Sequence, residues 1–271
     1  MPELPEAESI ARALNRTLKN QKIVKVEVFS PKLRTSLKPL VKAGLEGRTF
    51  LGCRRRSRYA LADMDDNRTL VMHFGMSGVV RVESARALRR KHEHVFIHLA
   101  DGRAVRFEDP RRFGFMEVHT VGRNGWPKMM DKLGVEPLGD DFTGEYLHAA
   151  ALKRKKSVKE LLMDNAIVTG IGNIYAAETL FAAGVSPLRK SASLDRCECD
   201  RIVRAARRIL REAIKWGGTT VSDFKNVDGS EGKFVQKLKI YSKTKCPKCK
   251  GEVSKAVQGG RTSWFCAACQ K

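Results

Sequence analysis

The sequence predicts an α+β protein: a β-rich N-terminal part that begins with a helix, a helical middle part and a short C-terminal module with four cysteines. Apolar residues recur at helical spacing over residues 5–19, alternate with polar residues in several runs between about 22 and 120, and return to helical spacing after 127. The 271 residues suffice for one large domain or two ordinary ones. The composition, 42% hydrophobic and 30% charged, is that of a globular protein and not of a disordered one.

The N-terminal part combines one helix with several strands. Ile10, Leu14 and Leu18 fall on one face of the helix, as packing against a core requires. The later runs KIVKVEVF, TLVMHF, VVRV, HVFIHL and AVRF have the composition of strands. An Asp-Gly pair at 101–102 separates the last two runs and is typical of a hairpin. We therefore expect one β domain over residues 1–122.

Glycine, asparagine and proline around residues 122–127 predict a linker, after which the pattern becomes helical. Helices are predicted over 143–154, 157–164, 173–183 and 195–215. The last helix carries a basic stripe made of Arg201, Arg204, Arg208, Arg211 and Lys215, opposite an apolar stripe. A solvated face is the favoured interpretation of this stripe over a face that reads a groove. With the turn-rich run 217–234 that follows, we expect a helical domain over 123–234 and a separate module over 235–271.

The charge is unusually positive, with 52 Lys and Arg against 30 Asp and Glu and a net charge of +22. Residues 1–124 contribute +11, residues 125–224 only +3 and residues 225–271 +8. This balance excludes an acidic binding surface and makes a polyanion such as a nucleic acid the leading partner. There is no apolar run long enough for a membrane span, and the acidic N-terminus lacks the features of a signal peptide. We expect a cytosolic chain.

Four of the seven cysteines predict a metal site. Cys246, Cys249, Cys266 and Cys269 have the spacing C-x2-C-x16-C-x2-C, in which each pair can place two thiolates on one ion. Four ligands leave no open position, so we expect one structural zinc ion, which also supplies folding energy to a small module. The alternative, a set of reduced buried cysteines, is disfavoured by the paired spacing. The remaining Cys53, Cys197 and Cys199 are expected to be ordinary thiols.

The N-terminus offers a candidate nucleophile. Removal of Met1 would expose the secondary amine of Pro2, and an α-amino group has a pKa of about 7.7–8.0, so roughly a tenth is neutral at pH 7. Such an amine can attack a sugar carbon and form an iminium, while Glu3 and Glu6 are placed for acid and base roles. The alternative is that Pro2 is only the first residue of a helix, where proline is common.

Six motifs in the same order resemble the formamidopyrimidine-DNA glycosylases: MPELPE, HFGMSG, DPRRFG, GIGNIYAAE, GGTTVSDF and the four-cysteine ribbon. The resemblance spans the whole chain. It implies an N-terminal β-sandwich, a helical domain with a helix–two-turns–helix (H2TH) and a zinc ribbon. It also implies a monomeric bifunctional DNA glycosylase and AP lyase of base excision repair. Its partner would be double-stranded DNA that contains an oxidised purine, such as 8-oxoguanine or a formamidopyrimidine, or an abasic site.

The resemblance also implies residue roles. Pro2 would attack C1′ of the lesion sugar, Glu3 would protonate the ring oxygen, and Glu6 would position the N-terminus. Met76, Arg111 and Phe113 would fill the gap left by the extruded nucleotide, and run 217–234 would cover the extruded base. The remaining assignments are DNA contacts for His92, Arg154 and Asn173, a place near the lesion pocket for Lys159, support of the active site for Glu178, and phosphate binding with δ-elimination for Arg261.

Each of these assignments has a plainer alternative. For Met76 and Phe113 it is packing in the core, for Asn173 a simple N-cap, and for Glu178 a solvated helix position. For His92, Arg154 and Lys159 it is unremarkable surface charge.

One position departs from the family pattern. The family usually has lysine in an R-x-K-Y segment, credited with phosphate binding and with the proton of β-elimination, whereas this chain has Arg58 between Ser57 and Tyr59. Arginine keeps the charge and can hold phosphate, but with a pKa above 12 it is a poor proton donor. A tolerated neutral exchange is the alternative. Two other functions stay open: an oxidised-pyrimidine glycosylase, and a damaged-DNA-binding protein with weakened lyase activity.

Overall fold

The computed structural model describes residues 2–221 and 224–271, which form two compact units. Unit 1 contains residues up to Asp131 together with the later segment Trp216–Lys233, and unit 2 contains Lys132–Lys215 and Phe234–Lys271. The turn-rich run thus groups with the β part of the chain and not with the helices that precede it. No helix among the described residues combines the length and the apolar character needed to cross a bilayer.

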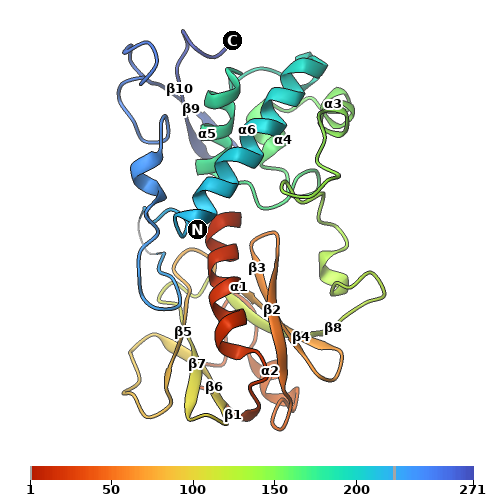
Figure 1. Ribbon diagram of the computed structural model, residues 1–271, viewed down its shortest axis with the longest axis vertical. Helices are drawn as coiled ribbons and strands as arrows, with labels where there is room; N and C mark the ends of the chain where they lie inside the picture. The colour runs from red at the N-terminus through yellow and green to blue at the C-terminus, as the bar shows by residue number, and fades with distance from the viewer. Residues whose placement is uncertain (1, 222–223) are drawn as a thin grey trace. The chain divides into compact units, whose positions relative to one another are not determined.

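Unit 1 is a sandwich of two four-stranded antiparallel sheets with a leading helix (Figure 1). One sheet has the order β1-β6-β7-β5 and the other β2-β3-β4-β8. The bounds are α1 Leu4–Leu18, β1 Ile23–Val28, α2 Lys38–Lys42, β2 Phe50–Arg56, β3 Tyr59–Met64, β4 Arg68–His73, β5 Val79–Ser84, β6 Glu93–Leu99, β7 Arg103–Glu108 and β8 Phe115–Thr120. A 3-10 turn, Lys128–Met130, follows.

A single hydrophobic core lies between the two sheets and α1. Ile10, Leu14 and Leu18 of α1 are buried in it, as the helical spacing predicts. Phe224 and Val227 from the later segment join the same core, which explains why that segment belongs to unit 1. The predicted hairpin at 101–102 is confirmed, since β6 and β7 are antiparallel neighbours.

Unit 2 contains the helices and the C-terminal hairpin. Their bounds are α3 Gly144–Leu152, α4 Val158–Leu162, α5 Asn173–Ala183, α6 Arg196–Lys215, β9 Ser254–Gln258 and β10 Arg261–Phe265, with 3-10 turns at Ser191–Ser193 and Phe234–Lys237. The four predicted helices are confirmed to within a few residues at each end. α5 packs against both α6 and β10, so it joins the helices to the hairpin.

Candidate active site

Pro2 lies outside the first helix. The N-cap of α1 is Glu3, and the proline of the first turn is Pro5, so Pro2 is not a helix-start residue and that plainer interpretation is wrong. Pro2 is buried within unit 1. The expected removal of Met1 concerns a residue outside the described part of the chain.

Glu6 connects the N-terminal segment to a distant loop. Its Oε2 accepts from the backbone N–H of Glu3 at 2.8 Å, and its Oε1 accepts from the N–H of Thr219 at 2.7 Å. The Glu3 carboxylate in turn accepts from the N–H of Glu6, which completes a capping box. Both carboxylates are buried, so these bonds form in a site shielded from water. Glu6 therefore fixes the backbone that follows Pro2.

Gly218 is required beside Glu6. It has a φ of +84°, and a Cβ there would lie 2.8 Å from Glu6 Oε1. A larger residue would displace the carboxylate that holds the N-terminus. The second glycine of GGTTVSDF is thereby explained by its close approach to Glu6, whereas the sequence alone indicated only a turn.

Arg58 sits at the turn between β2 and β3 and is only 7% exposed. The turn is held by Ser57, which has a φ of +56°, and by Arg55, whose Nη1 donates to the Ser57 carbonyl at 3.0 Å and whose Nε donates to Glu8 at 2.8 Å. The position of the family lysine is thus a largely buried, positively charged site in this chain.

His73 is a neighbour of Arg58 that sequence reasoning missed. Its ring stacks on Phe115 at 5.5 Å and lies 5.1 Å from the ring of Tyr59. Burial, together with the charges of Arg34 and Arg58, lowers the pKa of His73 to about 4. The ring is therefore neutral near pH 7, and its Nδ1 accepts from the N–H of Gly75 at 3.2 Å. The signal was the histidine that opens HFGMSG.

The loops that carry HFGMSG and DPRRFG are bound to each other. Asp109 is fully buried, and its two carboxylate oxygens accept from Ser77 Oγ and from the N–H of Gly114, each at 2.7 Å. Ser77 Oγ in turn accepts from the N–H of Arg111 at 3.2 Å. A Cβ on Gly75 would lie 2.4 Å from the backbone of the second loop. Asp109, which sequence reasoning also missed, is the residue that holds the pair together.

These loops present apolar side chains to solvent. Met76 is 39% exposed and Phe113 is 48% exposed, so the alternative that they pack in the core is wrong. The guanidinium of Arg111 lies over the Phe113 ring at 5.1 Å. A thioether, an aromatic ring and a planar cation are thus grouped on two mutually fixed loops, as a surface that stacks on bases requires.

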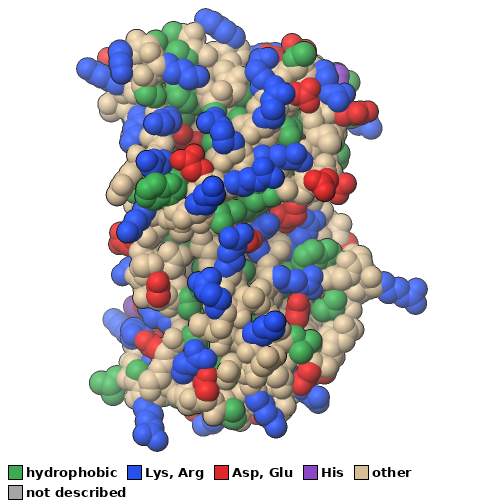
Figure 2. Space-filling model, in the orientation of Figure 1, with side chains coloured by type: hydrophobic (Ala, Val, Ile, Leu, Met, Phe, Trp, Pro, Cys, Tyr) green, Lys and Arg blue, Asp and Glu red, His purple; other side chains and the backbone are tan. Residues whose placement is uncertain are grey.

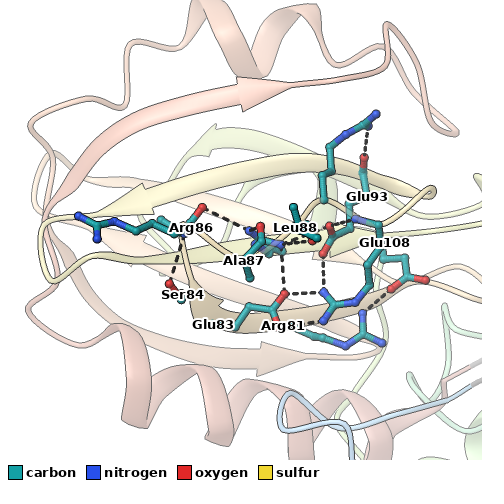
Figure 3. Close-up of polar contacts among 12 residues, drawn as sticks. Arg81, Glu83, Ser84, Arg86, Ala87, Leu88, Glu93 and Glu108 are labelled. Carbon is teal, nitrogen blue, oxygen red and sulfur yellow. Dashed lines mark hydrogen bonds and ion pairs between the residues drawn. The ribbon is translucent and has the colours of Figure 1, made fainter.

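His92 ends a basic loop that a buried arginine supports. Arg106 is fully buried, and its guanidinium donates to the carbonyls of Ala87 at 2.5 Å and Leu88 at 3.3 Å and pairs with Glu93. Figure 3 shows Ala87, Leu88 and Glu93 within this network. The His92 carbonyl accepts from the N–H of Asp109 at 3.0 Å, so this loop is also tied to DPRRFG.

Two predicted residues of unit 2 meet at the hairpin. Lys159 is 1% exposed and donates to Ser263 Oγ at 2.7 Å, while Asn173 donates from Nδ2 to the Thr262 carbonyl at 3.0 Å. The plainer alternatives are both wrong: Lys159 is not a surface charge, and the N-cap of α5 is Gly172. Asn173 instead lies at the start of α5, where the helix dipole favours an anion.

Arg261 and Arg154 are more accessible. Arg261 opens β10, is exposed, and lines a hollow with Lys156 and Glu160. Arg154 is half-buried after α3. Arg261 immediately precedes Thr262, whose carbonyl accepts the hydrogen bond from Asn173. Arg261 and Asn173 therefore lie in the same region of unit 2.

Glu178 is not a solvated helix residue. It is 4% exposed and accepts from the N–H groups of Lys239, Ile240 and Tyr241, each at 2.9 Å. Burial raises the pKa of Glu178, against the effect of these three bonds. Its visible role is to anchor the segment that leads into the cysteine module.

The four predicted zinc ligands are brought together. The sulfur atoms of Cys246, Cys249, Cys266 and Cys269 all lie within 4.8 Å of one another. Individual separations are 3.9 Å for Cys246–Cys269 and 3.5 Å for Cys249–Cys266, against about 3.8 Å for a tetrahedron with Zn–S bonds near 2.3 Å. The geometry fits one structural zinc ion.

The other three cysteines lie outside this cluster and are free thiols. Burial raises the pKa of Cys199 to about 12, and burial also raises the pKa of Cys53. Protonated buried thiols are poor nucleophiles, in keeping with the expectation that they are ordinary thiols.

Comparison with protein families gives three matches along the chain. Residues 1–116 match the formamidopyrimidine-DNA glycosylase N-terminal domain and residues 133–225 match the formamidopyrimidine-DNA glycosylase H2TH domain. Residues 244–271 match a zinc finger found in FPG and IleRS. The helix–two-turns–helix and the zinc ribbon are therefore present.

Similar proteins cover the full length. A formamidopyrimidine-DNA glycosylase of Thioalkalivibrio sulfidiphilus is 41% identical over 273 residues, and one of Xanthomonas campestris pv. campestris is 43% identical over 279, with all of each chain covered. Among solved structures, a Lactococcus lactis FPG mutant in complex with Fapy-dG-containing DNA matches with a TM-score of 0.91 and 32% identity over 100% of both chains. A Lactococcus lactis Fpg in complex with abasic-site DNA matches with a TM-score of 0.90 and 32% identity over 99% of each. The chain belongs to the formamidopyrimidine-DNA glycosylase family.

Proposed function

We propose that this chain excises oxidised purines from duplex DNA and then cuts the strand, with the Pro2 amine as nucleophile. Family membership makes it a DNA glycosylase of base excision repair. The observation that carries the finer proposal is the N-terminal arrangement: Pro2 precedes a capping box whose Glu6 also binds the loop at Thr219. We assign the activity to the cytosol. We divide the sequence into three domains, 1–122, 123–234 and 235–271, with the end of the second, Trp216–Lys233, packed into the unit of the first.

The chemistry follows from this arrangement. The Pro2 nitrogen bonds to C1′ as the base leaves with the glycosidic electron pair, and Glu3 delivers a proton to the ring oxygen as the sugar opens. Loss of the Pro2 N–H proton leaves the opened sugar as an iminium. The iminium accepts the electron pair left when a C2′ proton is removed, and the resulting enamine expels the 3′ phosphate, which departs with the C3′–O bonding pair and leaves a conjugated iminium. A second elimination releases the 5′ phosphate. Glu6 bears no part of these bonds; it holds the Glu3 backbone in place.

Excision requires that the nucleotide leave the stack. Met76, Arg111 and Phe113 are the residues proposed to occupy the gap, because they are exposed on two loops that Asp109 fixes. The phosphate contacts are assigned to five residues: Arg58 and His92 of unit 1, and Arg154, Asn173 and Arg261 of unit 2. Lys159 is proposed to act on the lesion pocket through the hairpin that it binds, because it is 1% exposed and donates to Ser263.

The purine preference rests on the run 217–234, which is present in full and is bound to Glu6 through Thr219. Excision of 8-oxoguanine and of thymine glycol from matched duplexes should be compared under single-turnover conditions. Faster excision of 8-oxoguanine is expected. Faster excision of thymine glycol would replace the proposal with the oxidised-pyrimidine alternative.

Borohydride trapping tests the nucleophile. Lesion-containing duplex should form a covalent adduct with the chain that begins at Pro2, and neither a Pro2→Gly variant nor a chain that retains Met1 should be trapped in this way. Adduct formation at an undiminished rate in both controls would show that the Pro2 nitrogen is not required. Peptide mapping of the trapped residue would then distinguish a lysine from the new N-terminal amine. Undamaged duplex serves as the control for non-specific adducts.

The buried Arg58 favours one refinement, that strand cutting lags behind base release. A guanidinium with a pKa above 12 gives up a proton poorly, so β-elimination lacks an efficient acid while phosphate binding is retained. An Arg58→Lys variant should raise the ratio of strand cleavage to base release by about tenfold. General acid catalysis usually contributes at least about a hundredfold, and we expect the lysine to restore part of that. An unchanged ratio would assign the exchange as neutral.

A further inference from the structure

The outward face of α6 is a row of cations that no described acid pairs. Arg204, Arg208, Arg211 and Lys215 are all exposed and follow one another at spacings of four, three and four residues, which places them on one side of the helix. We call these four residues the α6 cationic face. Within the described part of the chain, none of the four takes part in an ion pair, whereas Arg196 and Arg201 of the same helix do.

The arrangement is costly for an isolated helix, because like charges at i, i+3 and i, i+4 repel. The helix tolerates the repulsion because its opposite side, with Ile202, Ile209 and Leu210, is buried in the core of unit 2. A surface that keeps mutually repelling charges without internal partners is suited to an external polyanion.

The surface is hollowed and continues beyond the helix. A groove is lined by the α6 cationic face together with Arg207 and Glu212, and Glu212 is the only acid among the described residues lining it. Arg208 and Glu212 also line a neighbouring hollow to which Lys237, Lys239 and Lys248 contribute. Figure 2 shows Lys and Arg side chains following α6 across this face.

This surface is separate from the hollow of unit 2 that contains Arg261. The hollow that contains Arg261 shares no lining residue with either cationic groove. α5 packs against α6 on one side and against β10 on another, so it lies between the α6 cationic face and the hairpin that bears Arg261. Within unit 2, Figure 1 shows α6 nearer the viewer than the β9–β10 hairpin.

The chemistry of the face selects nucleic acid over other polyanions. A helix that inserts into a membrane surface needs exposed apolar residues interleaved with its cations, and the residues between these cations on α6, such as Ala205, Ile209 and Leu210, are buried in the core. A protein partner needs apolar or aromatic anchors at the centre of the interface, and none of the described residues lining the α6 groove is apolar; Phe181, Ile209 and Phe234 line only the neighbouring hollow. Over the row's length of about 16 Å, B-DNA carries about nine phosphates, and arginine binds them in bidentate fashion.

We propose that the α6 cationic face binds a second segment of duplex DNA while the lesion-recognition residues hold the first. The protein then passes from one segment to another through a doubly bound intermediate, without free diffusion. The inference rests on the proposed DNA contact elsewhere in the chain, but it adds a surface and a mode of search that the excision chemistry does not use.

Competitor-dependent dissociation tests this. The full-length protein on a fluorescent undamaged duplex is mixed with increasing unlabelled duplex, and the release rate is recorded. The wild-type release rate should rise in proportion to the concentration of competitor duplex. The slope of this dependence should fall by about a hundredfold between 50 and 200 mM salt, as the loss of four phosphate contacts implies. A combined R204Q/R208Q/R211Q/K215Q variant should release at a rate independent of competitor.

Two matched proteins complete the test. A K19Q/K22Q/K38Q/K42Q variant loses the same charge from exposed lysines of unit 1 and should transfer like wild type. An R204K/R208K/R211K variant keeps the charge of the face and should also transfer. Single-turnover excision by the R204Q/R208Q/R211Q/K215Q variant should be unchanged. If the excision proposal itself is wrong, none of these proteins will excise the lesion, and this result is distinct from a loss of transfer in one variant.

The proposal is overturned if the wild-type release rate does not depend on competitor. It is also overturned if the two four-residue glutamine variants lose transfer equally, which would assign the effect to net charge alone.

Discussion

Acidification should destabilise the native protein through His73 more than an ordinary histidine would. The pKa of His73 is lowered to about 4 by burial first and then by the charges of Arg34 and Arg58, against 6.5 for the unperturbed side chain. As the pH falls below 6.5, the unfolded chain binds a proton that the native ring does not accept until about pH 4. The His73 contribution is therefore complete above pH 6.5 and is lost between pH 6.5 and 4.

The magnitude follows from the size of the shift. A displacement of 2.5 units at about 1.36 kcal/mol per unit gives about 3 kcal/mol of unfolding free energy, a large part of the stability of an ordinary domain. Protonation would also remove the acceptor for the Gly75 N–H, which is bound at 3.2 Å, and so loosen the turn that presents Met76.

Urea unfolding at intervals from pH 7.5 to 4 provides the assay, with a His73→Asn variant as control. Asparagine offers an oxygen near the position of Nδ1 but does not titrate, and all other ionisable groups are shared by the two proteins. The wild type should lose about 3 kcal/mol more than the variant over this range. Parallel curves for the two proteins would refute the argument, as would an NMR titration that places the His73 pKa near 6.5.

Three further outcomes are expected. Removal of zinc by a chelator should unfold the C-terminal hairpin and leave the β-sandwich melting transition in place, as followed by hydrogen exchange; retained protection of β9–β10 would contradict a structural metal. Asp109→Ala should lower the unfolding free energy by about 2–4 kcal/mol, because Ser77 and the Gly114 N–H lose their buried acceptor, and should slow lesion excision more than it weakens binding of undamaged duplex. Gly75→Ala should slow excision similarly, because its Cβ would lie 2.4 Å from the Phe113 backbone at a φ of +55°, and wild-type rates would show that the loops need not touch.

Much of the fold could be predicted because it is encoded locally. α1 shows its buried face in the spacing of Ile10, Leu14 and Leu18, and the β6–β7 hairpin shows its turn in two residues. β2 was missed because its sequence FLGCRRR neither alternates nor is apolar throughout; it is a strand because it pairs with β3. Such pairing is a tertiary effect that local pattern does not contain.

The candidate site likewise has a part that the sequence predicts and a part that only the tertiary structure shows. The motifs place Pro2, Met76 and Phe113 on the segments that now carry them, but the contacts that hold those segments come from elsewhere. The bond from Thr219 to Glu6 spans 213 positions of sequence, and no periodicity reports a contact of that separation. In the sequence, Asp109 looks like an ordinary turn residue before a proline. The structure shows that it is buried and that its two oxygens accept from Ser77 Oγ in one loop and from the N–H of Gly114 in the other.

The return of Trp216–Lys233 to the β unit has a consequence for how the enzyme matures. The sandwich strands end at residue 120, yet the core still lacks Phe224 and Val227, and Glu6 still lacks Thr219. At a synthesis rate of about 5–20 residues per second, that segment emerges about 5–20 seconds after the last strand. During translation the N-terminal segment that bears Pro2 thus lacks the bond between Glu6 and Thr219 until all the helices up to α6 have been made. A truncated chain that ends in α6 lacks both this bond and the two core residues Phe224 and Val227.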